Sequence, residues 1–82
     1  LFDVRTMEEF NSGHLKGSVN IDFYDEKLFD KFFKKVKKSK PIYIYCRSGN
    51  RSQKSSEILK KLGFVKIYDL EGGYKNWINK SN

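Results

Sequence analysis

Apolar residues occur along the chain in short runs that alternate with amphipathic stretches. Runs rich in β-branched and aromatic residues predict buried strands at 1–4, 18–21, 42–45 and 65–70. Apolar spacings of three and four, together with capping signals, predict helices at 7–10, 25–39, 52–62 and 74–79. Strands that alternate with helices favour right-handed crossovers, so we expect one α/β unit with a mostly parallel sheet covered on both faces.

The first two predicted helices have clear start and stop signals. Thr6 followed by Glu9 matches the capping-box pattern at the start of the first helix. Pro41 stops the second helix, since proline cannot continue one. The apolar residues of the second helix define one inward face, namely Leu28, Phe29, Phe32, Phe33 and Val36.

The last two predicted helices follow the third and fourth strands. Ser52 is a natural N-cap for the third helix, and Gly63 occupies the position just past its end where a left-handed residue is needed. We expect three residues of this helix to face inward: Ile58, Leu59 and Leu62. In the terminal helix we expect Trp77 and Ile78 to be buried core residues.

Length and composition indicate a single small domain over residues 1–82. The 82 residues are 38% hydrophobic and 16% aromatic, enough for one core with much aromatic volume. No apolar stretch reaches membrane-spanning length, and no start of signal-peptide type is present, so we expect no membrane partner. The chain begins at Leu1, within a predicted strand, and we therefore expect a further segment ahead of it.

The chain has one cysteine, Cys46. A single thiol excludes an internal disulfide, a cysteine-based metal cluster and an intramolecular resolving thiol, so any chemistry at Cys46 needs an outside acceptor. We predict neither a metal nor a cofactor. An unpaired thiol favours the reducing cytoplasm, while the missing start leaves an exported location open.

Cys46 follows a predicted strand and precedes a predicted helix, a place where anions bind in parallel sheets. A lone cysteine is commonly a small buried hydrophobe. The residues after it favour a nucleophile, because Gly49 permits an unusual backbone turn and two guanidinium groups stabilise a thiolate. We predict Cys46 as the catalytic residue. The predicted substrate-binding residues are Arg47, Ser48, Gly49, Asn50 and Arg51, and Ser52 supports the loop.

Three other polar residues could belong to the site. Asp3 and Arg5 flank the end of the first strand, at the same sheet edge as Cys46. They either pair with the loop arginines and support the anion cradle or are ordinary strand-end charges, and we favour the first. His14 lacks a nearby acid to orient it, so we interpret it as a loop residue whose ring ties backbone groups together.

The chain is basic, with 17 lysines and arginines against 10 acidic residues and a net charge of +7, which favours anionic partners. The lysine-rich stretch 34–40 is either a nucleic-acid patch or the solvated end of an amphipathic helix. We favour the second interpretation, because lysines complement the helix dipole there. No nucleic-acid partner is expected.

Three separated motifs resemble those of the rhodanese family of sulfurtransferases in its single-domain form. The first motif comprises Asp3-Val4-Arg5, Glu9-Phe10, Gly13-His14-Leu15, Gly17, Asn20 and Ile21, with Ser18 and Val19 as mild variants. The second is Tyr45-Cys46-Arg47-Ser48-Gly49-Asn50-Arg51-Ser52, and the third is Leu70-Glu71-Gly72-Gly73 with Trp77. The resemblance implies a three-layer sandwich with a mostly parallel central sheet and helices on both faces. Family domains usually carry another strand and helix first, which implies that this chain is truncated at its N-terminus.

The resemblance also implies an activity, in which Cys46 takes the outer sulfur of a small anionic donor such as thiosulfate and holds it as a persulfide. A thiol, a protein acceptor or cyanide then removes that sulfur. Phosphatases and arsenate reductases of related fold have five residues between cysteine and arginine, whereas four separate Cys46 from Arg51. The smaller loop argues against phosphoryl chemistry. A partner-binding module without catalysis is the other alternative, but such a module would be expected to lack the cysteine.

Overall fold

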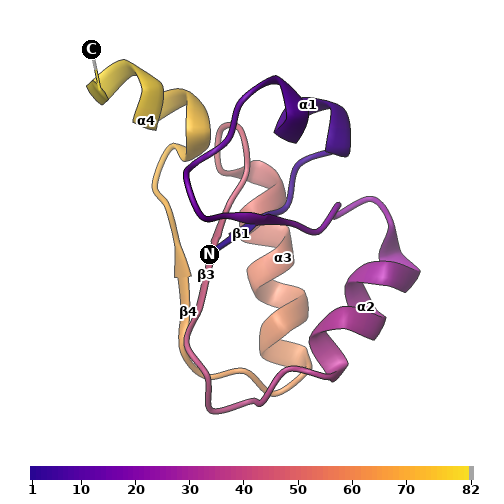
Figure 1. The fold of residues 1–82 in the computed structure, drawn as a ribbon. Helices are drawn as coiled ribbons and strands as arrows, with labels where there is room; N and C mark the ends of the chain where they lie inside the picture. The colour runs from indigo at the N-terminus through magenta and orange to yellow at the C-terminus, as the bar shows by residue number, and fades with distance from the viewer. Residues whose placement is uncertain (82) are drawn as a thin grey trace.

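The computed structural model describes residues 1–81 as four parallel strands and four helices (Figure 1). The strands form one sheet in the order β2-β1-β3-β4. They are β1 (Phe2–Asp3), β2 (Val19–Asn20), β3 (Ile42–Tyr45) and β4 (Ile67–Asp69). The helices are α1 (Met7–Ser12), α2 (Glu26–Lys34), α3 (Asn50–Lys61) and α4 (Gly73–Ser81). The predicted α/β class with a parallel sheet is confirmed.

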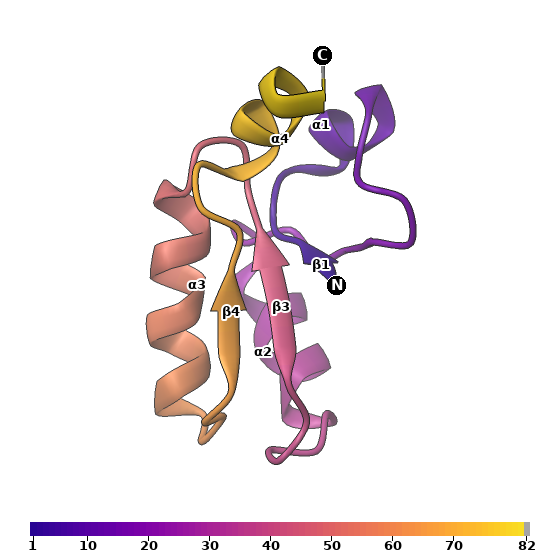
Figure 2. The ribbon, with the colours of Figure 1, turned by 90° about the vertical axis from the view of Figure 1, so that its left-hand side faces the viewer.

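The short strand β1 lies in the interior of the sheet and fixes its register. Phe2 is opposite Val19 of β2 and Ile44 of β3, and Asp3 is opposite Asn20 and Tyr45. Because all strands run in one direction, their carboxyl ends meet at one edge of the sheet. The loop after β3 lies at this edge, together with α1 and α4 (Figures 1 and 2).

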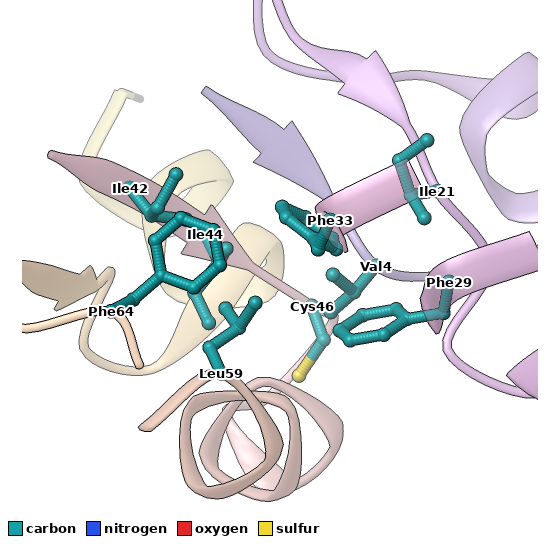
Figure 3. Close-up of a cluster of buried hydrophobic side chains, with 9 residues drawn as sticks. All are labelled: Val4, Ile21, Phe29, Phe33, Ile42, Ile44, Cys46, Leu59 and Phe64. Carbon is teal, nitrogen blue, oxygen red and sulfur yellow. The ribbon is translucent and has the colours of Figure 1, made fainter. Parts of the chain in front are cut away.

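The main core lies between the sheet and the two helices α2 and α3, which cover the same face (Figure 1). Aromatic rings fill much of this layer, as the composition predicts. Phe33 is fully buried, and its ring centroid is 4.8 Å from that of Phe29 and 6.1 Å from that of Phe64. Figure 3 shows the buried cluster, which includes Val4, Ile21, Phe29, Phe33, Ile42, Ile44, Cys46, Leu59 and Phe64.

The opposite face of the sheet is covered less completely. Tyr43 and Tyr68 stack on this face with ring centroids 4.9 Å apart, and both remain half-exposed. Helix α4 sits beyond the carboxyl ends of the strands rather than across the sheet (Figure 2). The prediction that Trp77 and Ile78 are core residues is therefore wrong, because these side chains are 49% and 40% exposed.

Helix α2 is shorter than predicted and ends at Lys34. The chain tightens just after the helix, since the N–H groups of Lys35 and Val36 bond to the carbonyls three residues earlier. The Nζ of Lys38 donates to the carbonyl of Phe33 at 3.0 Å, which also satisfies the helix end. Leu28, predicted to face inward, is half-exposed, because the buried seam of the helix runs through Phe29 and Phe33.

The ends of α3 and β4 also differ from the predicted ones. Helix α3 begins at Asn50 with Gly49 as N-cap, so the prediction of Ser52 as N-cap is wrong. Gly63 follows the helix in a left-handed conformation with φ of 106°, as predicted. Strand β4 starts at Ile67, and Val65, predicted to lie in it, precedes the strand and is 81% exposed. Ile58 of α3, predicted to face inward, faces partly outward.

Within residues 1–81 no helix is long and apolar enough to cross a membrane.

Candidate active site

Cys46 lies directly after β3, with its side chain between the core and the first turn of α3. The residue is only 1% exposed. Its Sγ accepts a hydrogen bond from the N–H of Gly49 at 3.0 Å and lies 3.5 Å from the Oγ of Ser52. Figure 3 shows the sulfur directed toward α3. The side chain is therefore held against backbone donors rather than packed only among apolar groups.

The electrostatics of this position favour the thiolate. Burial raises the pKa of the Cys46 thiol, but hydrogen bonds with the Ser52 hydroxyl and from the backbone N–H groups of Ser52, Gly49 and Ser48 lower it by more. The net effect is a pKa below the ordinary value of a cysteine. Hydrogen-bond donors at the start of a helix lower the pKa of a cysteine in this way.

The shape of the loop depends on Gly49 and on Ser52. Gly49 has a φ of 107°, a conformation that side-chain-bearing residues rarely adopt, and this turn brings its N–H onto the sulfur. Because α3 begins two residues earlier than predicted, Ser52 lies in the first turn of the helix. From there its hydroxyl donates to the carbonyl of Gly49 at 3.1 Å and reaches the sulfur.

Helix α4 holds the other side of the loop, a role that the sequence analysis missed. The N–H of Tyr74 donates to the carbonyl of Cys46 at 2.8 Å, and the N–H of Lys75 donates to that of Arg47 at 2.9 Å. In a planar trans peptide the N–H points opposite to the carbonyl. Because the carbonyls of Cys46 and Arg47 point toward α4, the N–H groups of Arg47 and Ser48 in the same peptides point away from it. Gly73 lets the backbone of α4 come close to the carbonyls of Cys46 and Arg47, because it has no side chain. In the sequence, the pair Gly72-Gly73 was the feature that could have indicated this contact.

We expect Gly73→Ala to disturb the Cys46 loop. A Cβ at Gly73 would lie 2.5 Å from the carbonyl oxygen of Cys46 and 2.6 Å from that of Arg47, and the φ of 66° adds backbone strain. The expected loss is roughly 2–4 kcal/mol of unfolding free energy, measured by urea denaturation. Gly17→Ala is the matched control, since Gly17 has a φ of 85° but no atom within 4 Å of an added Cβ. Equal losses in the two variants would contradict the contact with the loop.

The two loop arginines have different surroundings. Arg51 is clamped by Glu9, whose carboxylate oxygens accept hydrogen bonds from Nη1 at 2.6 Å and Nη2 at 2.9 Å. Glu9 belongs to the predicted capping box, which is confirmed: the Thr6 hydroxyl accepts from the N–H of Glu9, and the Thr6 N–H donates to the Glu9 carboxylate. Arg47 is exposed. The structure thus holds the Arg51 side chain, which belongs to α3, against Glu9 of α1, and it leaves the Arg47 side chain facing solvent.

Glu9 links stability to pH. Its hydrogen bonds with Arg51, helped by those from Thr6, outweigh burial and lower its pKa from 4.5 to about 2. A carboxylate with a depressed pKa stabilises the fold above its unfolded pKa, and this contribution is lost as pH falls from about 4.5 toward 2. We expect Glu9→Gln to lower the unfolding free energy by roughly 1–2 kcal/mol at pH 7, allowing for the partial exposure of both side chains.

This difference should shrink when urea denaturation is repeated below pH 4.5. Glu8→Gln on the exposed side of the same helix provides the control and should show little effect at either pH. A Glu9→Gln difference that stayed constant with pH would contradict the assigned ion pair.

Asp3 and Arg5 are buried but do not pair with the loop arginines, so that prediction is wrong. They pair with each other: the Nη2 of Arg5 lies 2.7 Å from Oδ2 of Asp3, and its Nε donates to both carboxylate oxygens at 3.0 Å. Nη2 of Arg5 also donates to the carbonyl of Gly13 at 2.6 Å, and its guanidinium lies 4.4 Å from the Tyr74 ring centroid. The pair therefore ties β1 to the loop after α1 and to α4.

The remaining predicted site residues lie at or near the same edge. Ser48 and Asn50 are exposed on either side of Gly49. His14 is structural, as interpreted from the sequence: its Nδ1 lies 2.9 Å from the carbonyl oxygen of Phe10, and the two rings stack at 3.7 Å. Among residues 1–81 no three His, Cys, Asp or Glu side chains gather in a way that could hold a metal ion.

Comparisons with known proteins agree with this architecture. The family described as Rhodanese-like domain matches residues 1–80. The chain is 41% identical over 78 residues to the tRNA uridine(34) hydroxylase of Pelagibacter ubique, but it spans only 26% of that protein. It is 35% identical to the thiosulfate sulfurtransferase GlpE of Pseudomonas savastanoi, with 94% of this chain and 70% of the relative covered.

A solved structure shows the same fold. The rhodanese-related protein of Thermoplasma volcanium superposes with a TM-score of 0.80 at 33% identity, over 96% of this chain and 75% of the other. The family match takes in the Cys46 loop and the α4 residues that hold it. This chain therefore belongs to the rhodanese-like domain family.

Proposed function

We propose that residues 1–82 act as one sulfurtransferase domain that carries a sulfane sulfur on Cys46. The observation that carries this proposal is the short hydrogen bond of 3.0 Å from the Gly49 N–H to the sulfur. Together with the lowered pKa of the thiol, it supports the proposal that Cys46 reacts as a thiolate nucleophile. The same backbone donors would stabilise the anionic outer sulfur of a persulfide.

In the first step the Cys46 thiolate attacks the outer sulfur of thiosulfate. The sulfur–sulfur bond of the donor breaks, its electron pair leaves with sulfite, and Cys46 keeps the sulfur as a persulfide. Arg47 is the cation open to the incoming dianion, while Glu9 holds the guanidinium of Arg51 in a fixed position beside the loop. The amides of the loop from Ser48 to Asn50 complete the cradle.

In the second step an outside thiol, or cyanide in an assay, removes the sulfur. Cys46 is the only cysteine in the sequence, so no internal thiol accepts it. The kinetics should follow a double displacement, with each substrate acting in turn. Asp3, Arg5 and Ser52 support the reaction by holding the loop and its surroundings in place.

The relatives and the loop length bear on the alternatives. The name of the GlpE relative supports sulfur transfer. The four-residue spacing from Cys46 to Arg51 disfavours a phosphatase, and an activated cysteine disfavours a purely structural module. The 41% identity to a tRNA uridine(34) hydroxylase favours a second candidate, in which such a domain serves a larger tRNA-modifying protein. Retained sulfur loading combined with binding to unmodified tRNA would support that candidate.

Intact mass spectrometry tests the main proposal. After incubation with thiosulfate and removal of the excess donor, we expect the protein to gain one sulfur atom, which cyanide then removes. The thiol is reduced beforehand and the reductant removed before thiosulfate is added, because a reductant would itself take the sulfur from the persulfide. Absence of the adduct in protein treated in this way would overturn the proposal. Hydrolysis of a phosphate ester by the unloaded protein would point to the phosphatase instead.

A further inference from the structure

A hollow of about 370 Å³ lies beside the Cys46 loop. Its walls come from α1, from Arg47 of the loop and from α4, which contributes Lys75. Both of these side chains are exposed, and within the described residues neither makes a hydrogen bond or ion pair. The backbone N–H of Lys75 donates to the carbonyl of Arg47 at 2.9 Å, so the two residues are fixed as neighbours.

The other charges around this hollow are already neutralised. Glu9 is occupied by the two hydrogen bonds from Arg51, and Arg5 is paired with buried Asp3 at 2.7 Å. The hollow therefore presents two cations without counter-charges, which attract an anionic ligand. Ser12 and Tyr74 add hydroxyl groups to the wall, and Ile78 adds an apolar surface.

The size of the hollow indicates which substrate it fits. Liquid water takes about 30 Å³ per molecule, so the space corresponds to roughly a dozen waters. Thiosulfate has only five heavy atoms and would leave most of it empty. A larger molecule with more than one anionic group would fill the volume and reach both cations, and the sulfur acceptor is the substrate whose size is not yet constrained.

We propose that Arg47 and Lys75 bind the carboxylates of a small anionic thiol that accepts the sulfur from Cys46. This inference rests on the proposed function. The acceptor thiolate attacks the outer sulfur of the Cys46 persulfide and forms a new sulfur–sulfur bond. The bond between that outer sulfur and Sγ breaks with its electron pair going to Sγ, so Cys46 returns as a thiolate and the acceptor leaves as a persulfide.

A single-turnover experiment isolates this step from donor binding. The protein is loaded with thiosulfate, freed of donor and mixed with increasing concentrations of mercaptosuccinate, a thiol with two carboxylates, or of 1-thioglycerol, a neutral thiol. Loss of the added sulfur is followed by intact mass. The ratio of the two second-order rate constants is compared between variants, because the intrinsic reactivity of each thiol then cancels.

We expect Lys75→Met to lower this ratio roughly three- to tenfold, the effect of losing one charge-assisted contact at a partly exposed site. Lys75→Arg should restore it. Lys60→Met, which removes the same charge from the far end of α3, should leave it unchanged. If wild-type protein takes no sulfur, the proposed function fails and this inference with it. If loaded protein shows the same ratio in wild type and Lys75→Met, the inference alone is overturned.

Discussion

Cys46→Ser is expected to abolish sulfur loading by thiosulfate while the fold remains intact. The serine hydroxyl is not ionised at neutral pH and is a poor nucleophile without a general base, so we expect a loss of at least about a thousandfold. The hydroxyl would still accept the hydrogen bond from the Gly49 N–H, now made to Sγ at 3.0 Å, and would not be left unsatisfied in its buried position. Intact mass after thiosulfate treatment measures the effect.

Ser56→Ala is a suitable control for this variant, because it alters a hydroxyl of α3 that bonds only to the carbonyl of Ser52. Circular dichroism and urea denaturation would show that Cys46→Ser is folded. Sulfur loading of the folded serine variant at the wild-type rate would refute Cys46 as the carrier.

Asp3→Asn is expected to cause the largest loss of stability. Asp3 is fully buried and neutralises Arg5, so the amide would leave a guanidinium charge without its partner inside the protein. Removing one member of a buried pair costs roughly 3–5 kcal/mol. A small domain has a total stability of only about 5–15 kcal/mol, so the variant should be largely unfolded at moderate urea concentration. The urea midpoint measures the change.

An exposed ion pair of the same chain supplies the control. Asp30 and Lys34 lie 2.9 Å apart on α2, with side chains 46% and 64% exposed, so Asp30→Asn should cost only about 0.3–0.5 kcal/mol. Adding Arg5→Met to Asp3→Asn should recover part of the stability, since the unpaired charge is then gone. Similar urea midpoints for Asp3→Asn and Asp30→Asn would show that the buried pair contributes little.

The sequence predicted helix ends correctly where the interaction that fixes them lies within a few residues along the chain. The capping box of Thr6 and Glu9 and the left-handed Gly63 depend on neighbours within one helix turn, and both are present. The parallel sheet follows from the alternation of strands and helices. Errors at the start of α3 arose because Gly49 and Ser52 are both acceptable N-caps, and the choice between them depends on the packing of the Cys46 loop.

The residue types at the candidate site were evident from the chain alone, because Cys46, Gly49 and the loop arginines lie within one short stretch. The residues that bond to them were not evident from the chain alone. Glu9 and Arg51 are 42 residues apart, and α4 reaches the Cys46 carbonyl from the far end of the chain. The order β2-β1-β3-β4 brings these segments to one edge of the sheet. Long-range packing, which no local pattern encodes, therefore decided that Arg51 is clamped, that Asp3 pairs with Arg5, and that Arg47 and Lys75 are left facing a hollow beside the Cys46 loop.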